Sequence, residues 1–227
     1  MYTDQFAPYN FINDKGELVG VNTDIVKVLC VKAKVDCDFK VVPWKRAFTL
    51  VNKTPHSAIF SIAKHKNRVP LFNWLGPLVS GKTYFYKLKS NSKVSMAHLE
   101  EAKKYSLGMV RGDIYESLVN KIGFTKEVNL MTFGEEHQYI ELFISKRIDL
   151  ILGSEHVIHN QLKRYGLSLN DVEKLQELSV TSDLKDNYLA FNKEVPEQII
   201  YRFNEAYNAV TQKPGLANFM QPYSYLK

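Results

Sequence analysis

The sequence predicts an α/β fold built from two units in series, and three observations carry that prediction. Short apolar runs typical of strands alternate with amphipathic segments typical of helices, which favours a mainly parallel sheet with helices on both faces. The alternation begins again after Gly76-Pro77, with no sequence repeat between the halves and no low-complexity linker. The length of 227 residues corresponds to one large domain or two small ones, at roughly 150 residues per domain.

In the first half, the element boundaries follow from turn and cap residues. Strands are expected at 1–4, 38–42 and 57–62, and helices at 23–33 and 44–52. Asn22-Thr23-Asp24 precedes the apolar run of the first helix and predicts an N-terminal cap there.

In the second half, the same alternation continues to the end of the chain. Strands are expected at 79–89, 105–110, 127–131, 148–152, 175–180 and 188–191, and helices at 95–103, 114–122, 135–145, 155–165 and 197–211. Two small α/β units therefore account for the length better than one large sheet.

The composition limits the class of protein. With 45% hydrophobic and 24% charged residues, a disordered or low-complexity chain is excluded. No stretch approaches the roughly 18 apolar residues that span a bilayer, and Met1 is followed by Tyr2-Thr3-Asp4 without a basic and apolar leader. The protein is therefore expected to be cytoplasmic, or a mature form whose leader has been removed. The net charge of +6 permits an anionic partner without requiring one.

Several common chemistries lack their signals. The glycine motifs of dinucleotide-binding proteins and P-loop proteins and the serine elbow of hydrolases are absent. His156 and His159 lack a third ligand at a suitable spacing, so no metal site is expected. The basic segment 64–68 has no interleaved aromatic residues, and nucleic-acid binding is not expected.

A small-molecule clamp is predicted at the carboxyl edge of the first sheet. Arg68 follows the strand at 57–62, and open α/β sheets bind ligands at that edge. A guanidinium there can hold a carboxylate with two hydrogen bonds. Phe6 and Trp44 follow two other strands and reach the same edge, with core packing as the alternative role for both rings.

Cys30 lies near the end of the first helix and Cys37 before the next strand. A helix end and the strand that follows can approach within the ~4.4 to 6.8 Å between Cα atoms that a disulfide needs. Two buried free thiols are the alternative, since cysteine also packs as a small hydrophobic residue.

The chain resembles the family 3 extracellular solute-binding proteins, the receptors that deliver amino acids to ABC importers. The resemblance rests on these segments: Thr3-Asp4, Ala7-Pro8-Tyr9, Gly16-Glu17-Leu18-Val19-Gly20, Asp24-Ile25-Val26, Pro43-Trp44, Ser61, Arg68, Phe72, Gly76-Pro77-Leu78 and Arg147-Ile148-Asp149. It runs from residue 3 to about 220 and is densest in the first 80 residues. The Cys30 and Cys37 spacing is similar to that of the histidine and lysine-arginine-ornithine binding proteins.

The resemblance implies a type II periplasmic-binding-protein fold, with two α/β lobes around one ligand and a hinge of two crossing strands. Lobe one would be 1–80 plus 187–227 and lobe two 81–186, with crossings near Val79 to Gly81 and Lys185 to Tyr188. It further implies a Cys30–Cys37 disulfide, an oxidising periplasm, a monomer, and an ABC permease as partner. No cofactor is implied.

The resemblance also assigns roles to single residues. Arg68 matches the arginine that grips the ligand carboxylate, and Ser61 matches a serine that hydrogen-bonds the ligand. Phe6 and Trp44 would form walls of the pocket. In lobe two, the turn Arg111-Gly112-Asp113 occupies the place where helix-start amides meet the carboxylate.

Two departures from the family pattern concern charge. Asp113 stands where a small hydroxyl residue is usual, and a carboxylate there would repel that of the ligand. Ser154 stands where the family has its ammonium-binding aspartate. Either Glu155, Asp113 or Asp4 then supplies the counter-charge, or the ligand is not a standard α-amino acid.

Two further functions share this fold. The first is a ligand-binding sensor domain of a membrane signalling protein. The second is a dehydratase-type enzyme, for which Glu155, Asp113 and Asp4 would be the candidate acids or bases. No paired base is visible in the sequence, so a receptor without catalytic residues is the preferred prediction.

Overall fold

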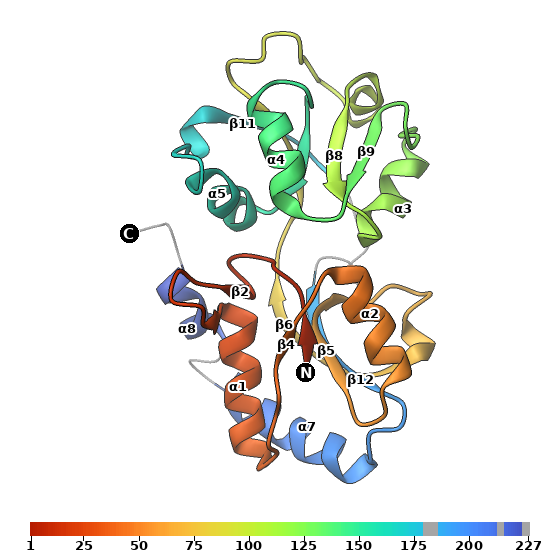
Figure 1. Ribbon diagram of the computed structural model, residues 1–227, viewed down its shortest axis with the longest axis vertical. Coiled ribbons are helices and arrows are strands. Elements are labelled where there is room, and N and C mark those ends of the chain that lie inside the picture. The colour runs from red at the N-terminus through yellow and green to blue at the C-terminus, as the bar shows by residue number, and fades with distance from the viewer. Residues whose placement is uncertain (179–185, 213–215, 224–227) are drawn as a thin grey trace. The chain divides into compact units, whose positions relative to one another are not determined.

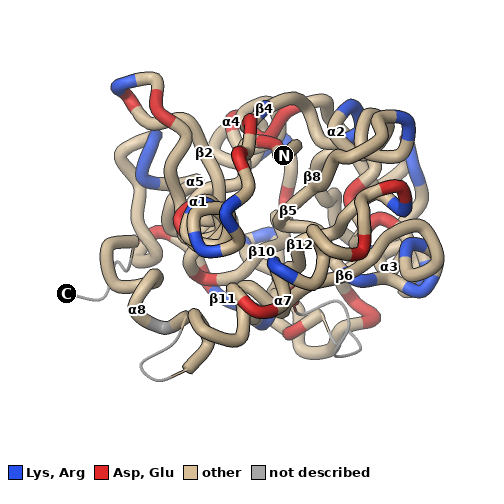
Figure 2. Tube along the Cα trace, turned by 90° about the horizontal axis from the view of Figure 1, so that it is seen from below, with Lys and Arg blue, Asp and Glu red and all other residues tan. Residues whose placement is uncertain are grey.

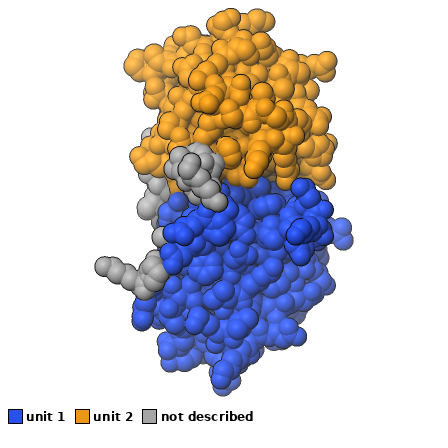
Figure 3. Space-filling model, turned by 90° about the vertical axis from the view of Figure 1, so that its left-hand side faces the viewer, with its two compact units in different colours: residues 1–80, 181–227 blue, residues 81–180 orange. Residues whose placement is uncertain are grey.

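The computed structural model describes residues 1–178, 186–212 and 216–223, and the chain forms two compact units (Figure 1). Unit 1 comprises Met1–Ser80 and Thr181–Lys227, and unit 2 comprises Gly81–Val180 (Figure 3). Lys185, at the expected second crossing, and the end of the expected strand at 175–180 lie outside the described residues. The expected lobe boundary after residue 186 stays a prediction.

Unit 1 is built on a mixed five-stranded sheet with the strand order β4-β1-β5-β12-β6. Its strands are β1 (Tyr2–Thr3), β4 (Lys40–Val41), β5 (Ala58–Ala63), β6 (Phe72–Ser80) and β12 (Asp186–Asn192). β1 pairs in parallel with β4 and β5, whereas β12 runs antiparallel to both β5 and β6. The α/β class is thus confirmed. Four of the five strands share one direction, as the expectation of a mainly parallel sheet requires, and β12 runs against them between β5 and β6.

The strand expected at 79–89 covers only the last two residues of β6, and the rest of β6 was not predicted. Gly76-Pro77 indicates a turn, because proline lacks the amide that a sheet ladder needs. In the structure this dipeptide lies where the register between β6 and β12 shifts, so that Leu75 pairs with Leu189 and Val79 with Asn187. A bulge of this kind accommodates a proline inside a strand.

Four α-helices lie in the described part of unit 1: α1 (Val21–Ala33), α2 (Trp44–Lys53), α7 (Glu197–Thr211) and α8 (Ala217–Met220). α1 and α2 lie on different sides of the sheet, and α7 packs against α1 (Figure 1). A short hairpin of β2 (Phe11–Ile12) and β3 (Leu18–Val19) precedes α1. No helix among the described residues has both the length and the apolar character needed to cross a bilayer.

The predicted cap of α1 is wrong. The helix begins at Val21, and its N-cap is Gly20, which has a φ of 124° and no side chain to offer. The Val21 amide donates to the Pro8 carbonyl, and the Asn22 amide donates to the Tyr9 carbonyl at 2.9 Å. The backbone of an earlier loop therefore satisfies these helix-start amides, which leaves the Asn22 side chain for another role.

Tyr223 fixes the last described segment to the start of α1. Its hydroxyl accepts from the Gly20 amide at 2.9 Å and donates to Asp24 Oδ2 at 2.6 Å. Burial, followed by the hydrogen bond to the Asp24 carboxylate, raises the pKa of Tyr223 to about 12.

This contact predicts a loss of stability in alkali. The pKa of Tyr223 lies above its ordinary value in the folded state, so the folded protein retains a proton that the unfolded chain loses. The contribution is full below pH 10 and falls as the pH rises from about 10 to about 12. Burial also raises the pKa values of Tyr139, Tyr165 and Tyr207, so we expect spectrophotometric titration to show several late-titrating tyrosines, of which Tyr223→Phe removes one. A titration unchanged by that substitution would contradict this assignment.

Unit 2 has two small sheets. β10 (Ile151–Gly153) and β11 (Val172–Glu177) flank β7 (Tyr84–Leu88) in antiparallel order, and β8 (Leu107–Val110) pairs in parallel with β9 (Leu130–Phe133). A bridge between Leu107 and Leu150 connects β8 to the segment before β10. The helices are α3 (Ile114–Lys121), α4 (Glu136–Ile144) and α5 (Glu155–Lys163). The expected helix at 95–103 is instead a 3₁₀ segment at Leu99–Lys104.

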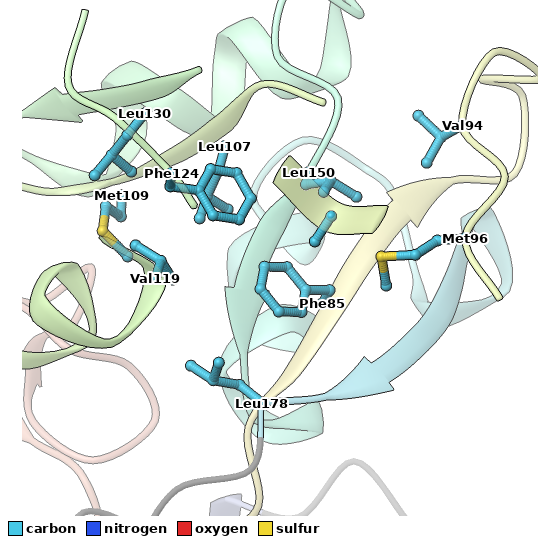
Figure 4. Packing of buried hydrophobic residues seen from close by; sticks show 11 residues of the cluster. Phe85, Val94, Met96, Leu107, Met109, Val119, Phe124, Leu130, Leu150 and Leu178 are labelled. Atoms are coloured by element: carbon cyan, nitrogen blue, oxygen red, sulfur yellow. The ribbon is translucent and has the colours of Figure 1, made fainter. Parts of the chain in front are cut away.

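One core of unit 2 lies between these sheets and α3 (Figure 4). The Phe85 and Phe124 rings stack with their centroids 6.2 Å apart. Met109, Val119 and Leu130 are buried in the same cluster. This packing fixes the ends of β8 and β9, from which the loops to α3 and α4 begin.

The Cys30–Cys37 disulfide is confirmed. The two Cα atoms lie 6.2 Å apart, and no free cysteine remains. The bond joins the end of α1 to the segment that leads into β4.

Replacing both cysteines by serine is expected to lower the free energy of unfolding by roughly 2 to 3 kcal/mol, because the bond closes a short loop in the unfolded chain. Urea denaturation of the double variant and of the reduced wild-type protein measures this effect. The reduced protein should match the variant, and a variant as stable as the oxidised protein would contradict the expectation.

Candidate functional site

Unit 1 gathers its predicted site residues at one edge of the sheet. β1, β4 and β5 run in parallel, so the loops that follow them begin at the same edge. Asp4 and Phe6 follow β1, Trp44 follows β4, and Arg68 follows β5. The structure brings Trp44 and Arg68 into contact there.

Arg68 lies over two aromatic rings of α2. Its guanidinium carbon is 5.2 Å from the centroid of the Trp44 ring and 5.3 Å from that of Phe48. Its Nη1 lies 3.5 Å from the Ala63 carbonyl oxygen. The rings hold the guanidinium while leaving it partly exposed, which suits two hydrogen bonds to a carboxylate. Phe48 was not predicted as a site residue, although its position four residues after Trp44 on a helix was a usable signal.

The Trp44 ring begins a continuous row of aromatic side chains. The row passes from α2 to β6 and β12 through Trp44–Phe48 at 6.2 Å, Phe48–Phe72 at 5.9 Å, Phe72–Trp74 at 5.7 Å and Trp74–Tyr188 at 5.9 Å between ring centroids. Lys64 lies over the Tyr188 ring at 5.7 Å. Such a row gives the loop 64–71 a rigid apolar support.

Ser61 lies in a buried hydrogen-bonded chain. Its Oγ donates to Asn10 Oδ1 and accepts from Asn22 Nδ2 at 2.8 Å. Asn10 Nδ2 in turn donates to the Asp4 carbonyl at 2.8 Å and lies 3.4 Å from Asp4 Oδ1. Ser61 has a φ of 63°, a strained value for a residue with a side chain. Because the Ser61 hydroxyl donates its hydrogen bond to Asn10, Ser61 can only accept from a ligand.

Asn10 and Asn22 hydrogen-bond the candidate site residue Ser61, and the sequence did not reveal them. Both are fully buried, and they lie far from Ser61 in the chain. The signal in the sequence is an asparagine beside an apolar run at each position, because a buried asparagine needs hydrogen-bond partners. Asn22 also fits a helix cap, which is the role that the sequence predicts for it.

Phe6 lies in a tight loop that also supports α1. The Phe6 carbonyl accepts from the Tyr9 and Asn10 amides at 2.8 and 3.0 Å, and the two rings of Phe6 and Tyr9 are 5.0 Å apart. The Phe6 side chain is half-buried. Its role as a pocket wall stays a prediction.

In unit 2, polar groups of the turn at 111–113 hydrogen-bond to residues of the helix that follows it, α3. Asp113 is the N-cap of α3, and its Oδ1 accepts from the Tyr115 amide at 2.9 Å. The Gly112 amide donates to Glu116 Oε2 at 3.0 Å, and Arg111 Nη2 lies 3.4 Å from the Thr132 carbonyl. Burial acts to raise the pKa of Glu116, but Lys126 and the Gly112 amide outweigh it, so that pKa lies below its ordinary value. A carboxylate therefore already occupies one amide of the predicted anion site.

Ser154 and Glu155 have structural partners as well. Ser154 is the N-cap of α5, and its Oγ lies 3.4 Å from the Val157 amide. Glu155 pairs with Lys174 at 3.1 Å, and Lys174 lies over the Tyr84 ring at 5.0 Å. Both side chains of this pair are 44% exposed, so solvent screens the attraction and Glu155 keeps a cation beside it within unit 2.

A further polar cluster in unit 2 was not predicted. Gln161 Nε2 donates to the Tyr139 hydroxyl at 3.0 Å, and Glu136 lies near the Gln161 side chain. Burial raises the pKa of Glu136 and that of Tyr139. In the described ranges of the chain, no three His, Cys, Asp or Glu side chains are placed to hold a metal ion.

Comparison with known proteins identifies the same family over nearly the whole chain. The model of the bacterial extracellular solute-binding proteins, family 3, matches residues 1–224. The arginine-binding periplasmic protein of Mannheimia haemolytica is 22% identical over 194 residues, covering 81% of this chain and 77% of the relative.

Two solved structures show the same fold. The substrate binding protein of an amino acid ABC transporter has a TM-score of 0.79 at 16% identity and covers 98% of this chain and 96% of its own. A histidine kinase sensor domain with similarity to periplasmic binding proteins has a TM-score of 0.83 at 13% identity, covering 99% and 95%. The expected periplasmic-binding-protein fold is thereby confirmed.

Proposed function

Because the chain belongs to the bacterial extracellular solute-binding proteins of family 3, we propose that it binds a small zwitterion, an amino acid or a close relative, at the carboxyl edge of the unit 1 sheet. The observation that carries this proposal is the Arg68 guanidinium held over Trp44 and Phe48. A fixed, partly exposed guanidinium beside aromatic surface binds a planar carboxylate with little loss of side-chain entropy.

Ser61 and Asp4 are the proposed partners of the positive charge of the ligand. The Ser61 hydroxyl can only accept, and the Asp4 carboxylate is an acceptor when ionised. The same buried asparagine positions both residues. They are therefore suited to a ligand ammonium or guanidinium rather than to a second carboxylate.

Among the three candidate counter-charges, we propose Asp4, because it follows β1 at the same sheet edge as Arg68. Glu155 and Asp113 belong to unit 2, where Glu155 lies beside Lys174 and Asp113 caps α3.

Asp113 and Ser154 remain candidate contacts of unit 2. The Arg111 amide already donates to the Phe133 carbonyl at 2.7 Å and the Gly112 amide to Glu116 at 3.0 Å, so a ligand would have to displace these bonds to use the amides.

Arginine is the first ligand to test. The relative from Mannheimia haemolytica is named as an arginine-binding periplasmic protein, and arginine carries one carboxylate and two cationic groups. We further propose that the protein is a periplasmic monomer and delivers its ligand to a permease in the membrane. A structural relative is the substrate binding protein of an amino acid ABC transporter, which supports this. No residue is assigned a catalytic role.

Isothermal titration calorimetry tests the ligand class. We expect saturable binding of L-arginine or of another basic amino acid, and binding at least 100-fold weaker for agmatine, which is arginine without the carboxylate. Agmatine binding as tightly as arginine would contradict the role of Arg68. Lack of binding by every amino acid would contradict the ligand class.

A sensor domain of a membrane signalling protein is the second candidate, because a histidine kinase sensor domain has the same fold. Both functions begin with the same binding event, so calorimetry does not separate them. Reconstitution does: ligand uptake by vesicles that carry a candidate ABC permease should require this protein. Uptake that is independent of the protein would favour the sensor.

A further inference from the structure

α2 presents a basic face that no acid interrupts. Its exposed residues Lys45, Arg46 and Lys53 lie on one side of the helix with the uncharged Thr49 and Asn52, since their spacing follows the helical repeat. Ala47 and Val51 are buried on the other side. Lys and Arg segments are seen along α2 in Figure 2.

Among the residues that the structure describes, no acidic side chain pairs with these cations. The sequence contains no Asp or Glu between Asp38 and Glu100, so neither α2 nor the elements that follow it in unit 1 up to Ser80 offer an acid. Within the part of the chain that the structure describes, Lys45, Arg46 and Lys53 form no ion pair. Lys45 and Arg46 also occupy the first turn, where the helix dipole disfavours positive charge. Their positions therefore cost the fold some stability.

The loop at 64–71 extends this face. Arg68 joins the loop to α2 through its contacts with Trp44 and Phe48, and the two segments lie side by side (Figure 1). Lys66 is exposed in the loop, and Val69 and Leu71 expose 42% and 40% of their surface. We call Lys45, Arg46, Lys53 and Lys66, together with these two apolar residues, the α2 basic face.

We infer that the α2 basic face docks on the anionic headgroup surface of a phospholipid bilayer. Long, solvent-exposed lysine and arginine side chains without acidic neighbours match a diffuse layer of negative charge, and exposed valine and leucine can enter the headgroup region. A protein or nucleic-acid partner fits less well, because the face offers flexible charges and two aliphatic side chains rather than aromatic stacking residues. Docking of this kind would hold an extracellular binding protein near a membrane, where its permease would lie.

Vesicle sedimentation tests this inference with the full chain. We expect binding to vesicles containing phosphatidylglycerol, no binding to pure phosphatidylcholine, and loss of binding as salt increases. The triple variant Lys45→Gln/Arg46→Gln/Lys53→Gln should bind about 100-fold more weakly, since each cation near an anionic surface contributes about five-fold.

The control variant is Lys15→Gln/Lys27→Gln/Lys32→Gln, which removes the same charge from the hairpin and from α1 on the other side of the sheet. It should keep binding within about three-fold of the wild type. Equal weakening of both variants would overturn the inference, as would binding to heparin or duplex DNA at a salt concentration where vesicles are not bound. Because neither triple variant changes a proposed ligand contact, calorimetric affinity for the amino acid separates this outcome from failure of the proposed function.

Discussion

Replacing Arg68 by alanine is expected to weaken ligand binding by about 100- to 1000-fold. The substitution removes the cation that would form two charge-assisted hydrogen bonds to the ligand carboxylate, and it leaves that carboxylate desolvated beside Trp44 and Phe48. Truncating one partner of such a pair costs about 3 to 4 kcal/mol, which corresponds to this change in Kd. Isothermal titration with the amino acid identified for the wild-type protein gives the measurement.

The conservative variant Arg68→Lys separates charge from geometry. A lysine keeps the positive charge but cannot form the paired hydrogen bonds of the guanidinium, so an intermediate affinity is expected. Arg202→Ala is the matched control, because Arg202 is an exposed arginine of α7 whose Nη1 lies 3.4 Å from the Lys34 carbonyl. If Arg68→Ala binds as tightly as Arg202→Ala, Arg68 is not the carboxylate-binding residue.

A loss of affinity without unfolding supports the role of Arg68 most directly. Arg68 also contacts two rings of the aromatic row, so its removal affects the stability of the fold as well as ligand binding. The melting temperature of Arg68→Ala is therefore measured together with its affinity. We expect it to fall by only a few degrees, since an exposed cation–π contact contributes about 0.5 to 1 kcal/mol.

The position of Arg68 beside Trp44 was predictable because it depends on strand direction alone. Loops that follow parallel strands share an edge, and the sequence shows where β4 and β5 end. Family resemblance identified the fold and the pairing of Cys30 with Cys37, whose positions within one helix–strand connection limit their separation. These features require only local order along the chain.

The environment of Ser61 was not predictable in this way. Its partners Asn10 and Asn22 reach it from a loop and a helix that pack over β5, and only the folded core brings these segments together. The antiparallel direction of β12 likewise depends on how the chain returns to unit 1. Nor does the local sequence show that Lys174, from a later strand, lies beside Glu155.

Gly20→Ala is the second substitution for which we expect a large effect. It should lower the free energy of unfolding by about 3 kcal/mol or more. A Cβ atom at this position would lie 2.5 Å from the Tyr9 carbonyl oxygen, 2.6 Å from its carbon and 2.8 Å from the Asn10 nitrogen. All three are backbone atoms that cannot rotate away. The φ of 124° is also unfavourable for any residue with a side chain.

The same substitution should weaken ligand binding, because the displaced loop carries Asn10. Asn10 accepts the hydrogen bond of the Ser61 hydroxyl and donates one to the Asp4 carbonyl, so a shift of its backbone disorganises both proposed acceptors. Urea denaturation and calorimetry on one protein preparation measure the two effects together.

Gly16→Ala is the matched control for the backbone contribution. Gly16 also has a positive φ, of 78°, but a Cβ there would meet nothing within 4 Å. Its replacement should cost only about 1 kcal/mol and leave ligand affinity unchanged. The difference between the two variants isolates the close approach of Gly20 to the loop at 6–10. Equal losses in both would mean that positive φ alone sets the cost, and that the approach of Gly20 to Tyr9 does not organise the site.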